Sequence, residues 1–544
     1  MPIFVGSNSD DSRIRSDRVG LAVSTANPGS ASEGDVYFNS SDSGLRAYDG
    51  SAWSAVGAGG GSFSGIASGT LANGQTVVIT TDGKISGITS TGIGLTSGEP
   101  KNLGPLNEQI SNNSIAYDES QKKLFVVYQS NANSDYPYGV VGTITGTGIT
   151  FGTPQRIRTS RISYAPSVVY HPPTKNIVFA FHSSSGIYGY TASIKDDTFI
   201  LGAEGSYLQQ TSGIYFIKLM YHKQTENIVM LNLNQPSTNP GFWGQVLKID
   251  ADVVTPMGAV RASTSGNTLS NERFGATYIE SDGRVIGFWR DQTAGYQSFQ
   301  SIGTISGTSL TWGTQQSGPG SSENIHLVYD HPSGNILVPL AHNNKIKYRV
   351  GIVTAGDDYI QYTALAEPSS NQPSDGSPTY LQATFDPIEK KYLFTYRQRD
   401  SNSNYYQAVT QGTFNGTTLT LDSSIQTQIF GINPNYPSST YVSDEKLNVN
   451  VIGFNTGAYA HTIQSARTTS NLTSDNFLGF SDAAYSDGQT ATVQIAGSVD
   501  DAQSNLTTGS RHFVNRVGTL TTIADSPSVV GGFAISATKI IVKK

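Results

Sequence analysis

The stretch "HLVYDHPSGNILVPLA", residues 326–341, contains the pattern that decides the fold. It reads as an apolar strand that ends at Tyr329, a short polar turn around residues 332–335, and a second apolar strand. Six other stretches share this pattern: "SIAYDESQKKLFVVYQ" (114–129), "SVVYHPPTKNIVFAFH" (167–182), "KLMYHKQTENIVMLNL" (218–233), "GATYIESDGRVIGFWR" (275–290), "QATFDPIEKKYLFTYR" (382–397) and "STYVSDEKLNVNVIGF" (439–454). The chain is therefore built from an internal repeat.

The aromatic residue that ends the first strand of each copy gives the period. These anchors are separated by 53, 51, 57, 51, 56 and 56 residues, and they are Tyr117, Tyr170, Tyr221, Tyr278, Tyr329, Phe385 and Tyr441. The rest of the unit recurs as strand, Gly-containing turn and strand, as in "GVVGTITGTGITFGTPQ" (139–155), "SIGTISGTSLTWGTQQ" (301–316) and "VTQGTFNGTTLTLDSS" (409–424). Four-stranded units of about fifty residues are typical of β-propellers. We therefore predict an all-β fold with a seven-bladed β-propeller of four-stranded blades.

The composition agrees with strands and turns and excludes several classes of function. Of 544 residues, 58 are Gly, 28 Tyr and 22 Phe, and only 14% are charged. The net charge of −7 disfavours binding to nucleic acid. No apolar run approaches the roughly 18 residues of a membrane span, and the N-terminus is too polar for a signal peptide. The absence of cysteine excludes disulfides, thiolate zinc sites and cysteine nucleophiles.

Composition changes along the chain predict four regions. Residues 1–60 are rich in Ser, Asp and Gly, and residues 61–100 contain a Gly-rich linker followed by strands. The propeller is expected over 101–473, and a β-rich module over 474–544. Propellers commonly close by pairing N-terminal strands with the last blade, so the hairpin at 83–100 is the favoured closing segment. The alternative is that residues 458–473 complete the last blade themselves.

The segment "ASEGDVYFNSSDSGLRAYDGSAW" (31–53) predicts a β-hairpin with a terminal Trp. It resembles a hairpin module of tailed-bacteriophage structural proteins, particularly tail fibres and other appendages. The matching residues are Gly34, Asp35, Tyr37, Phe38, Asn39, Leu45, Arg46, Tyr48, Gly50 and Trp53. The resemblance implies that this region attaches the protein to the virion, with Tyr37, Phe38, Tyr48 and Trp53 as the attachment residues.

The C-terminal sequence resembles a second module of phage proteins. Its stretches "FLGFSDAAYSDGQTATVQIAGSVDDAQSNLTTGSRHFV" and "GTLTTIADSPSVVGGFAISATKIIVK" are similar to a domain at the ends of marine and cyanobacterial phage appendage proteins. The two resemblances imply a virion component made in the host cytoplasm. Its implied partners are other tail or capsid proteins, further copies of itself in a cyclic homo-oligomer such as a trimer, and host-surface polysaccharide or lipopolysaccharide.

Histidines and paired carboxylates are the candidates for chemistry. His326, His331 and His342 lie within one repeat, but the turn places His331 at the opposite end of the strands from the other two, which disfavours a shared metal ion. The polar position after the anchor holds Asp or His in different copies, so it predicts a turn-initiating hydrogen-bonding residue. Carboxylate pairs such as Asp357–Asp358 lie in predicted turns. We therefore expect no catalytic residue, metal or cofactor.

The loops between the second and third strands of each unit carry the strongest binding signal. They vary in length and combine aromatic rings with Asn, Ser and Gly, which is the vocabulary of recognition loops and suits sugars. The candidate ligand-binding residues are Tyr136, Tyr188, Phe242, Trp243, Tyr296, Tyr405 and Tyr406. An aromatic near the start of the third strand recurs from copy to copy, which also fits packing between blades.

The sequence thus predicts a non-enzymatic phage tail fibre or receptor-binding appendage that recognises a host-surface glycan. Two alternatives remain open at this point. The first is a purely structural decoration or tail-associated protein whose propeller only makes virion contacts. The second is a glycan depolymerase on the same scaffold, which would need two carboxyl groups about 5–10 Å apart in a sugar-binding cleft.

Overall fold

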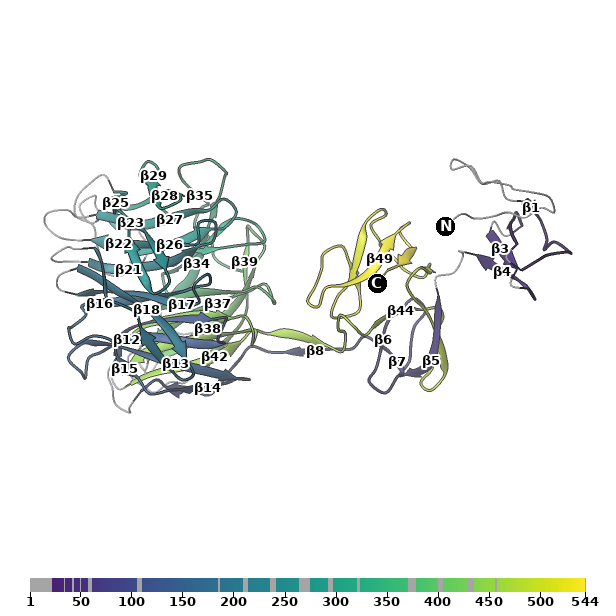
Figure 1. Cartoon of the computed structure of the whole chain (residues 1–544), viewed down its shortest axis with the longest axis horizontal. Helices are drawn as coiled ribbons and strands as arrows, with labels where there is room; N and C mark the ends of the chain where they lie inside the picture. The colour runs from purple at the N-terminus through teal and green to yellow at the C-terminus, as the bar shows by residue number, and fades with distance from the viewer. Residues whose placement is uncertain are drawn as a thin grey trace. The chain divides into compact units, whose positions relative to one another are not determined.

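The computed structural model describes residues 22–543, apart from 34, 42–43, 49, 57–60, 105–109, 184–185, 209–213, 235–240, 264–273, 292–296, 320–322, 370–377, 400–404, 428–434 and 455–456. The chain divides into two compact units, residues 94–467 and residues 1–93 with 468–544 (Figure 1). Every element of the described residues is a β-strand, which confirms the all-β prediction. Accordingly, nothing in the described ranges is a helix long and apolar enough to cross a membrane.

Residues 94–467 form antiparallel sheets that follow one another in sequence. In most of them the first four strands pair in chain order, and a short fifth strand pairs with the third. The first three sheets are β11 (Ile110–Asp118), β12 (Lys123–Ser130), β13 (Tyr136–Thr145), β14 (Gly148–Phe151) with β15 (Gln155–Arg156); β16 (Tyr164–His171), β17 (Asn176–Ser183), β18 (Gly186–Lys195), β19 (Thr198–Leu201) with β20 (Gly205–Leu208); and β21 (Ile214–His222), β22 (Asn227–Asn234), β23 (Gly241–Asp250), β24 (Val253–Pro256) with β25 (Val260–Arg261).

The later sheets repeat this order. They are β26 (Phe274–Ile279), β27 (Arg284–Asp291), β28 (Gln297–Ser306), β29 (Ser309–Trp312) with β30 (Gln316–Ser317); β31 (Glu323–Ile325) and β32 (Val328–Tyr329), β33 (Ile336–His342), β34 (Lys345–Ile352), β35 (Gln361–Tyr362); β36 (Thr379–Asp386), β37 (Lys391–Arg399), β38 (Tyr405–Phe414), β39 (Leu419–Thr427); and β40 (Asn435–Val442), β41 (Leu447–Phe454), β42 (Gly457–Gln464) with β9 (Thr96–Ser97) and β10 (Lys101–Asn102).

The turn between the first and second strands has the same backbone in each sheet. Five residues after each anchor, the chain adopts a positive φ of 52–74°, at Lys122, Lys175, Glu226, Gly283, Gly334, Lys390 and Lys446. This left-handed position closes a tight four-residue turn at one register. The repeat seen in the sequence is therefore a repeat of backbone geometry as well.

The sheets close a ring through their first strands. β11 packs against β16, β16 against β21, and so on to β40, which packs against β11. The side chain of Tyr117 on β11 donates a hydrogen bond to Asp444 Oδ2, 2.6 Å away in the turn after β40. This unit is thus a β-propeller-like arrangement of antiparallel sheets, each with a main order of four strands, in agreement with the predicted propeller fold.

The closing strands differ from the expected segment 83–100. Only β9 and β10 join the last sheet, where Thr96 pairs with Gln464 and Asn102 with Tyr459 on β42. β8 (Ser90–Ile93) instead pairs with β43 (Arg467–Ser470) outside the ring. The last sheet takes its outer strands from the N-terminal side of the unit because β42 is followed directly by the chain that leaves it.

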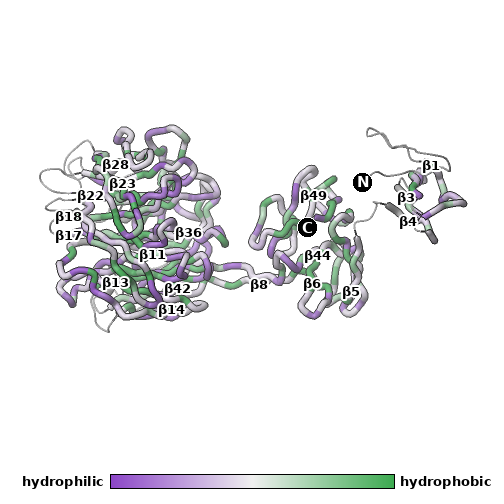
Figure 2. The backbone as a smooth tube through the Cα atoms, viewed as in Figure 1, coloured by the Kyte–Doolittle hydropathy of each residue, from purple (hydrophilic) through white to green (hydrophobic). Residues whose placement is uncertain are grey.

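Apolar side chains fill the spaces between neighbouring sheets. The second strands β17 and β22 are buried along their whole length, as expected for strands covered on both faces. Figure 2 shows hydrophobic residues along the strands and hydrophilic residues at turns. The core therefore consists of separate inter-sheet layers rather than one central cluster.

The other unit contains a closed barrel and a second sheet. The barrel combines β5 (Ser62–Ser68), β6 (Thr76–Ile79) and β7 (Ile85–Gly87) with β44 (Phe477–Ser481) and β45 (Thr490–Gln494). The sheet contains β46 (Val499–Asp500), β47 (Arg511–Val514), β48 (Leu520–Thr521), β49 (Val529–Ala534) and β50 (Ile540–Val542). Residues 62–87, expected in a linker and the closing strands, are thus half of a barrel that the C-terminal segment completes.

The N-terminal region forms a four-stranded sheet of β1 (Ala22–Ser24), β2 (Val36–Asn39), β3 (Gly44–Tyr48) and β4 (Trp53–Val56). β2 and β3 make the hairpin at the predicted position. Tyr37 is buried and makes an edge-to-face contact with Trp53, with ring centroids 4.8 Å apart, and Tyr48 packs on the same Trp at 5.4 Å. Three of the four predicted attachment residues therefore form the small aromatic core of this sheet, and the fourth, Phe38, is half-buried.

Candidate binding site

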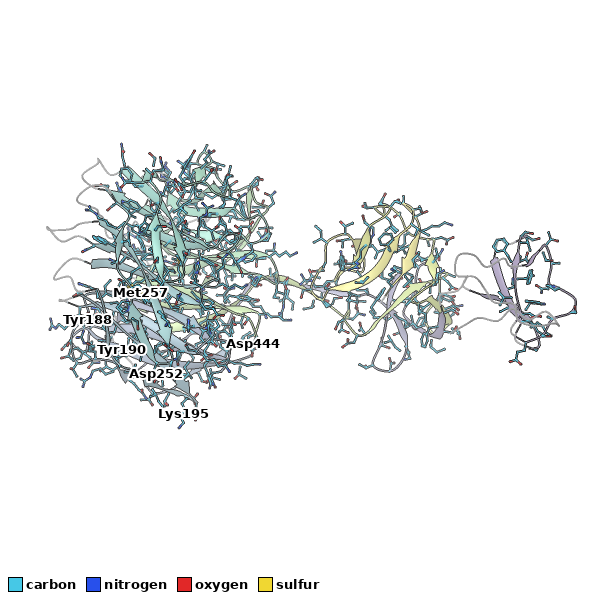
Figure 3. The ribbon with its side chains drawn as sticks, turned by 45° about the horizontal axis from the view of Figure 1, so that its top comes forward. Tyr188, Tyr190, Lys195, Asp252, Met257 and Asp444 are labelled. Atoms are coloured by element: carbon cyan, nitrogen blue, oxygen red, sulfur yellow. The ribbon has the colours of Figure 1, made fainter. Side chains whose placement is uncertain are left out.

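The two ends of the ring differ in what they carry. One end, the turn end, holds the turns between first and second strands, such as 119–122, and the chain both joins and leaves the ring there, because Thr96 pairs with Gln464. The opposite end, the loop end, holds the connections between second and third strands, such as 131–135. Figure 3 shows Tyr188 and Asp444 at these opposite ends. The loop end is thus the end without a chain connection to the other unit.

Three of the predicted loop aromatics are half-buried rings that contact arginines. Arg156 lies over Tyr136 at 5.5 Å from the ring centroid, and Arg158 lies over Tyr188 at 4.2 Å. The Tyr405 ring is contacted by Arg397 at 4.8 Å and by Arg399 at 5.5 Å. These cation–π contacts occupy ring faces that a sugar would otherwise stack on, so the loop end presents arginine and tyrosine together.

Two other predicted ligand-binding residues, Phe242 and Tyr406, are buried and so are not exposed to a ligand. Phe242 is fully buried and stacks on Trp289 of the next sheet, with centroids 4.8 Å apart and planes 6° apart. Its ring fills the space above Gly287, where an added Cβ would lie 2.1 Å from the ring. Tyr406 is also buried, in the layer that faces β34. Both positions serve packing between sheets, the role that their recurrence in the sequence had left open.

The remaining two predicted loop aromatics have different outcomes. Trp243 is half-buried on β23, opposite Arg261 on β25. Tyr296 lies outside the described residues.

The polar position after the anchor holds neighbouring sheets together at the turn end. Asp118 accepts hydrogen bonds from the backbone N–H groups of Ser120 and Gln121, at 2.9 and 3.1 Å. His171 contacts Thr174 in its own turn and, through Nε2, the carbonyl oxygen of Glu226 in the next sheet at 2.7 Å. Asp118 and His171 thus both make side-chain hydrogen bonds to the turn that follows them, which confirms the turn-initiating role.

His331 and His326 of the opening stretch lie in separate environments, and His342 ends β33 as a half-buried residue. His331 Nδ1 lies 2.7 Å from Glu280 Oε2 in the neighbouring turn. Burial and the charge of Lys218 lower the pKa of His326 to about 3, so this imidazole is neutral. No group of three or more metal-ligating side chains occurs within the described ranges.

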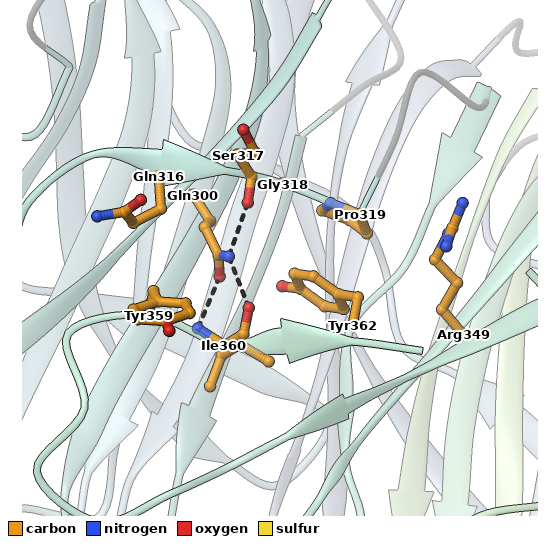
Figure 4. A pocket seen from close by; sticks show the side chains of 9 residues that line it. All are labelled: Gln300, Gln316, Ser317, Gly318, Pro319, Arg349, Tyr359, Ile360 and Tyr362. Atoms are coloured by element: carbon orange, nitrogen blue, oxygen red, sulfur yellow. Dashed lines mark hydrogen bonds between the residues drawn. The ribbon is translucent and has the colours of Figure 1, made fainter. Parts of the chain in front are cut away.

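A pocket of about 340 Å3 opens between the β26–β30 sheet and the β31–β35 sheet. This volume lies at the lower end of the range for small-ligand pockets, about 300–1,000 Å3. Figure 4 shows the lining residues, which are Gln300, Gln316, Ser317, Gly318 and Pro319 from the first sheet and its following loop and Arg349, Tyr359, Ile360 and Tyr362 from the second. The pocket therefore depends on side chains from two consecutive repeats.

The floor of the pocket is fixed by Gln300. Its Nε2 donates to the carbonyl oxygens of Ser317 and Ile360, both at 2.8 Å, and its Oε1 accepts from the Ile360 N–H at 3.1 Å (Figure 4). The side chain is 1% exposed, so these bonds are shielded from water. A buried amide whose donors and acceptor are used on both sheets holds their spacing at this point.

Two polar atoms in the pocket wall remain free. Among the described residues, neither Nε of Arg349 nor the hydroxyl of Tyr362 has a hydrogen-bond partner, although both atoms are buried. A buried donor without an acceptor costs about 1–3 kcal/mol. A ligand that brings an acceptor would recover this cost. Tyr359 is 38% exposed and adds an aromatic surface at the same site.

The sequence did not single out these pocket residues. Arg349 and Tyr362 lie on the third and fourth strands of one repeat, and Gln300 and Pro319 belong to the repeat before it. No spacing motif joins them, because the pocket exists only where two sheets pack. The third strand of this repeat, 345–352, combines Lys345, Lys347 and Arg349 with apolar residues, which gave no specific sign of a pocket.

Comparisons with known proteins bear on the fold alone. No protein-family model matches this sequence, and no curated protein matches it. Among solved structures, the chain is similar to a Lactobacillus plantarum protein (TM-score 0.40, 12% identity, 65% of this chain and 95% of that one). It is also similar to Sqt1 from Chaetomium thermophilum (0.39, 10%, 68% and 100%) and to a mutant of NanB sialidase from Streptococcus pneumoniae (0.39, 9%, 67% and 71%). The class defined by the sheets is an all-β, β-propeller-like protein.

Proposed function

We propose that residues 94–467 are a seven-bladed β-propeller within a bacteriophage virion appendage, which binds a host-surface glycan without cleaving it. The blade count is supported by the seven anchors and by the ring of first strands from β11 to β40. The virion assignment is supported by the resemblance of residues 31–53 and 474–544 to modules of phage appendage proteins.

The observation that carries the binding role is the pocket between β30 and β35. It offers an exposed aromatic ring, amide groups and two free donors, which suit the C–H faces and hydroxyl groups of sugars. A single small pocket binds a sugar weakly. Several copies on one particle would supply the avidity that attachment to a cell needs.

The N-terminal sheet is the proposed attachment to the particle. Since Tyr37 is buried, the surface available for contact is formed by exposed apolar residues instead, chiefly Val23 on β1 and Val36 on β2, which are 67% and 40% exposed. These residues lie on neighbouring strands. An apolar contact of this kind would bind another virion protein rather than a sugar.

The test is binding of the full-length chain to an array of bacterial surface polysaccharides. We expect saturable binding that falls at least tenfold in Tyr359→Ala, while His331→Ala, at the turn end, leaves it unchanged. Loss of binding in both variants, or in neither, would remove the pocket from the proposal. Release of reducing ends from a bound polysaccharide would replace the non-enzymatic role with the depolymerase alternative.

The virion assignment has a separate test. Antibody labelling of purified particles should place the protein at a distal tail position, and Trp53→Ala should reduce its incorporation because the core of the N-terminal sheet is lost. A collar or internal position would favour the purely structural alternative. Incorporation that is unchanged by Trp53→Ala would contradict attachment through this sheet.

A further inference from the structure

The pocket contains a cation that has no counter-ion among the described residues, and from this we infer that it accepts an acidic sugar through its carboxylate group. The inference rests on the proposed function, because it names the ligand class of the same pocket. It depends on three observations: the state of the Arg349 guanidinium, the second free donor on Tyr362, and the surface available to the rest of a sugar ring.

Arg349 lies on β34 and makes no ion pair with any described carboxylate. Glu367, the acidic residue that follows β35, forms ion pairs with Lys345 at 2.8 Å and with Lys347 at 3.2 Å. The Arg349 side chain is half-buried, and this burial lowers its pKa. A partly desolvated guanidinium gains more from an incoming anion than one in open water does.

The orientation of Arg349 is set before a ligand arrives. Its Nη1 donates to the carbonyl oxygen of Thr363 at 2.7 Å, which anchors one side of the guanidinium plane. Within the part of the chain that the structure describes, Nε has no acceptor. A planar guanidinium presents paired N–H groups that match the two oxygens of a carboxylate, so the remaining edge is suited to that group in particular.

Tyr362 supplies a second donor from the adjacent strand. Its hydroxyl is buried and has no partner within the described residues, and burial raises the pKa of this phenol. The hydroxyl therefore stays protonated and can donate a hydrogen bond at every physiological pH. One cation and one neutral donor without a second charge favour a singly charged carboxylate over a phosphate, which would bring up to two negative charges.

The remainder of the wall suits a sugar ring. Tyr359 offers an exposed ring for the C–H face, and Gln316 is half-buried with an amide that can meet hydroxyl groups (Figure 4). The tyrosine-bound arginines at the loop end, Arg156, Arg397 and Arg399, add positive charge on other sheets. An acidic polysaccharide with regularly spaced carboxylates would meet several of these positions.

The experiment compares acids with their uncharged esters. Full-length protein is titrated calorimetrically with oligosaccharides that contain glucuronate, galacturonate or sialic acid, and with the methyl ester of each. We expect at least one acid to bind ten or more times tighter than its ester. Arg349→Gln should abolish this preference, and Tyr362→Phe should weaken the acid several-fold.

Lys195→Gln is the matched control, because it removes one exposed positive charge at the turn end of a different sheet and should leave the preference unchanged. Thermal unfolding of each variant checks that the fold is intact. If acids and esters bind equally, or if Arg349→Gln keeps the preference, the inference is wrong while glycan binding stands. If no glycan of either kind binds, the inference and the proposed function both fail.

Discussion

Two inter-sheet layers of the ring have the same backbone but opposite chemistry. Between β21–β24 and β26–β29, Phe242 stacks on Trp289 within a layer of mainly apolar side chains. Between β36–β39 and β40–β42, strand alternation makes polar side chains face each other: Thr395 and Gln407 on one sheet, Asn448, Asn450 and His461 on the other. We call this second layer the polar seam. Its apolar contacts are limited to small groups around Ile463 and Ile452.

The polar seam leaves buried groups without partners. The side-chain amides of Gln407 and Asn448, Nδ2 of Asn450 and both ring nitrogens of His461 have no hydrogen-bond partner among the described residues. All of these side chains are at most 1% exposed. Buried polar groups of this kind weaken an interface or recruit ordered water. A repeating backbone therefore does not imply uniform cohesion, and we expect the polar seam, beside the closing strands, to be the weakest layer of the ring.

The largest effect is expected in the apolar layer. Trp289→Ala removes a fully buried ring and its stack with Phe242, so we expect a loss of about 3–5 kcal/mol in the free energy of unfolding. Urea denaturation followed by tryptophan fluorescence of the full chain measures it. A loss below about 1 kcal/mol would show that this layer is no more cohesive than the polar seam.

The second prediction concerns pH and the polar seam. Burial lowers the pKa of His461 to about 4 from an ordinary value of 6.5, so the unfolded chain binds this proton more readily than the folded chain does. The contribution of His461 to stability should be fully present well above pH 6.5 and should fall by up to about 3 kcal/mol as the pH drops to 4.

A substituted protein tests whether His461 is responsible for that loss. His461→Gln should flatten the part of the pH profile that belongs to the polar seam, and His182, whose pKa burial also lowers to about 4, should retain its own share. Equilibrium unfolding at a series of pH values measures both profiles. A profile that His461→Gln leaves unchanged would mean that the imidazole is not buried in solution.

The third prediction concerns a substitution, Asn450→Leu, that makes the polar seam more similar to the apolar layer. Asn450→Leu replaces a buried amide that lacks a donor contact, so we expect stability to rise by about 1 kcal/mol. The reverse change on the other face of the same strand, Val449→Asn, should destabilise by a larger amount because Val449 lies in an apolar layer. Destabilisation by Asn450→Leu would instead indicate that bound water already satisfies the amide.

The smallest effect concerns the hydrogen bond that closes the ring. Tyr117→Phe removes the contact to Asp444 but keeps the ring in place, and the expected cost is about 1 kcal/mol. Hydrogen exchange should show faster opening of β40 and β11 than of β16 and β21. Equal exchange in both pairs would contradict a role for this bond in holding the two ends of the ring.

The sequence predicted the repeat because anchors such as Tyr117 and Tyr441 recur at a steady spacing. It could not separate packing aromatics from the other loop aromatics. Tyr136 pairs with the last residue of β12 and Phe242 with the second-last residue of β22, so the two rings lie on opposite faces of their sheets. The polar seam was hidden because polar residues in strands normally indicate a solvent-facing side. The left-handed turn position was hidden because Lys or Glu occupies it in most copies.

The barrel and the pocket were missed for a different reason. β5 pairs with β45, and the whole ring lies between them in the sequence, so no local pattern connects the two strands. The pocket likewise joins Gln300 to Ile360 across two repeats. Periodicity in the sequence predicts the strands and turns within each repeat. Contacts between segments that are distant in the sequence can be identified only from the three-dimensional structure.

The pairing of β9 and β10 with β42 has a consequence for biosynthesis. These strands leave the ribosome before every other strand of the ring, whereas their partner strand is synthesised last. Ser97 therefore cannot pair with Ile463 until nearly the whole ring has been translated. The barrel strands β5 to β7 pair later still, because their partners β44 and β45 follow the ring in the sequence. During translation these edges stay open and prone to non-native pairing. Productive folding therefore ends with the pairing of these C-terminal strands. A chain that ends before β42 lacks β42, β44 and β45, so it can close neither the ring nor the barrel.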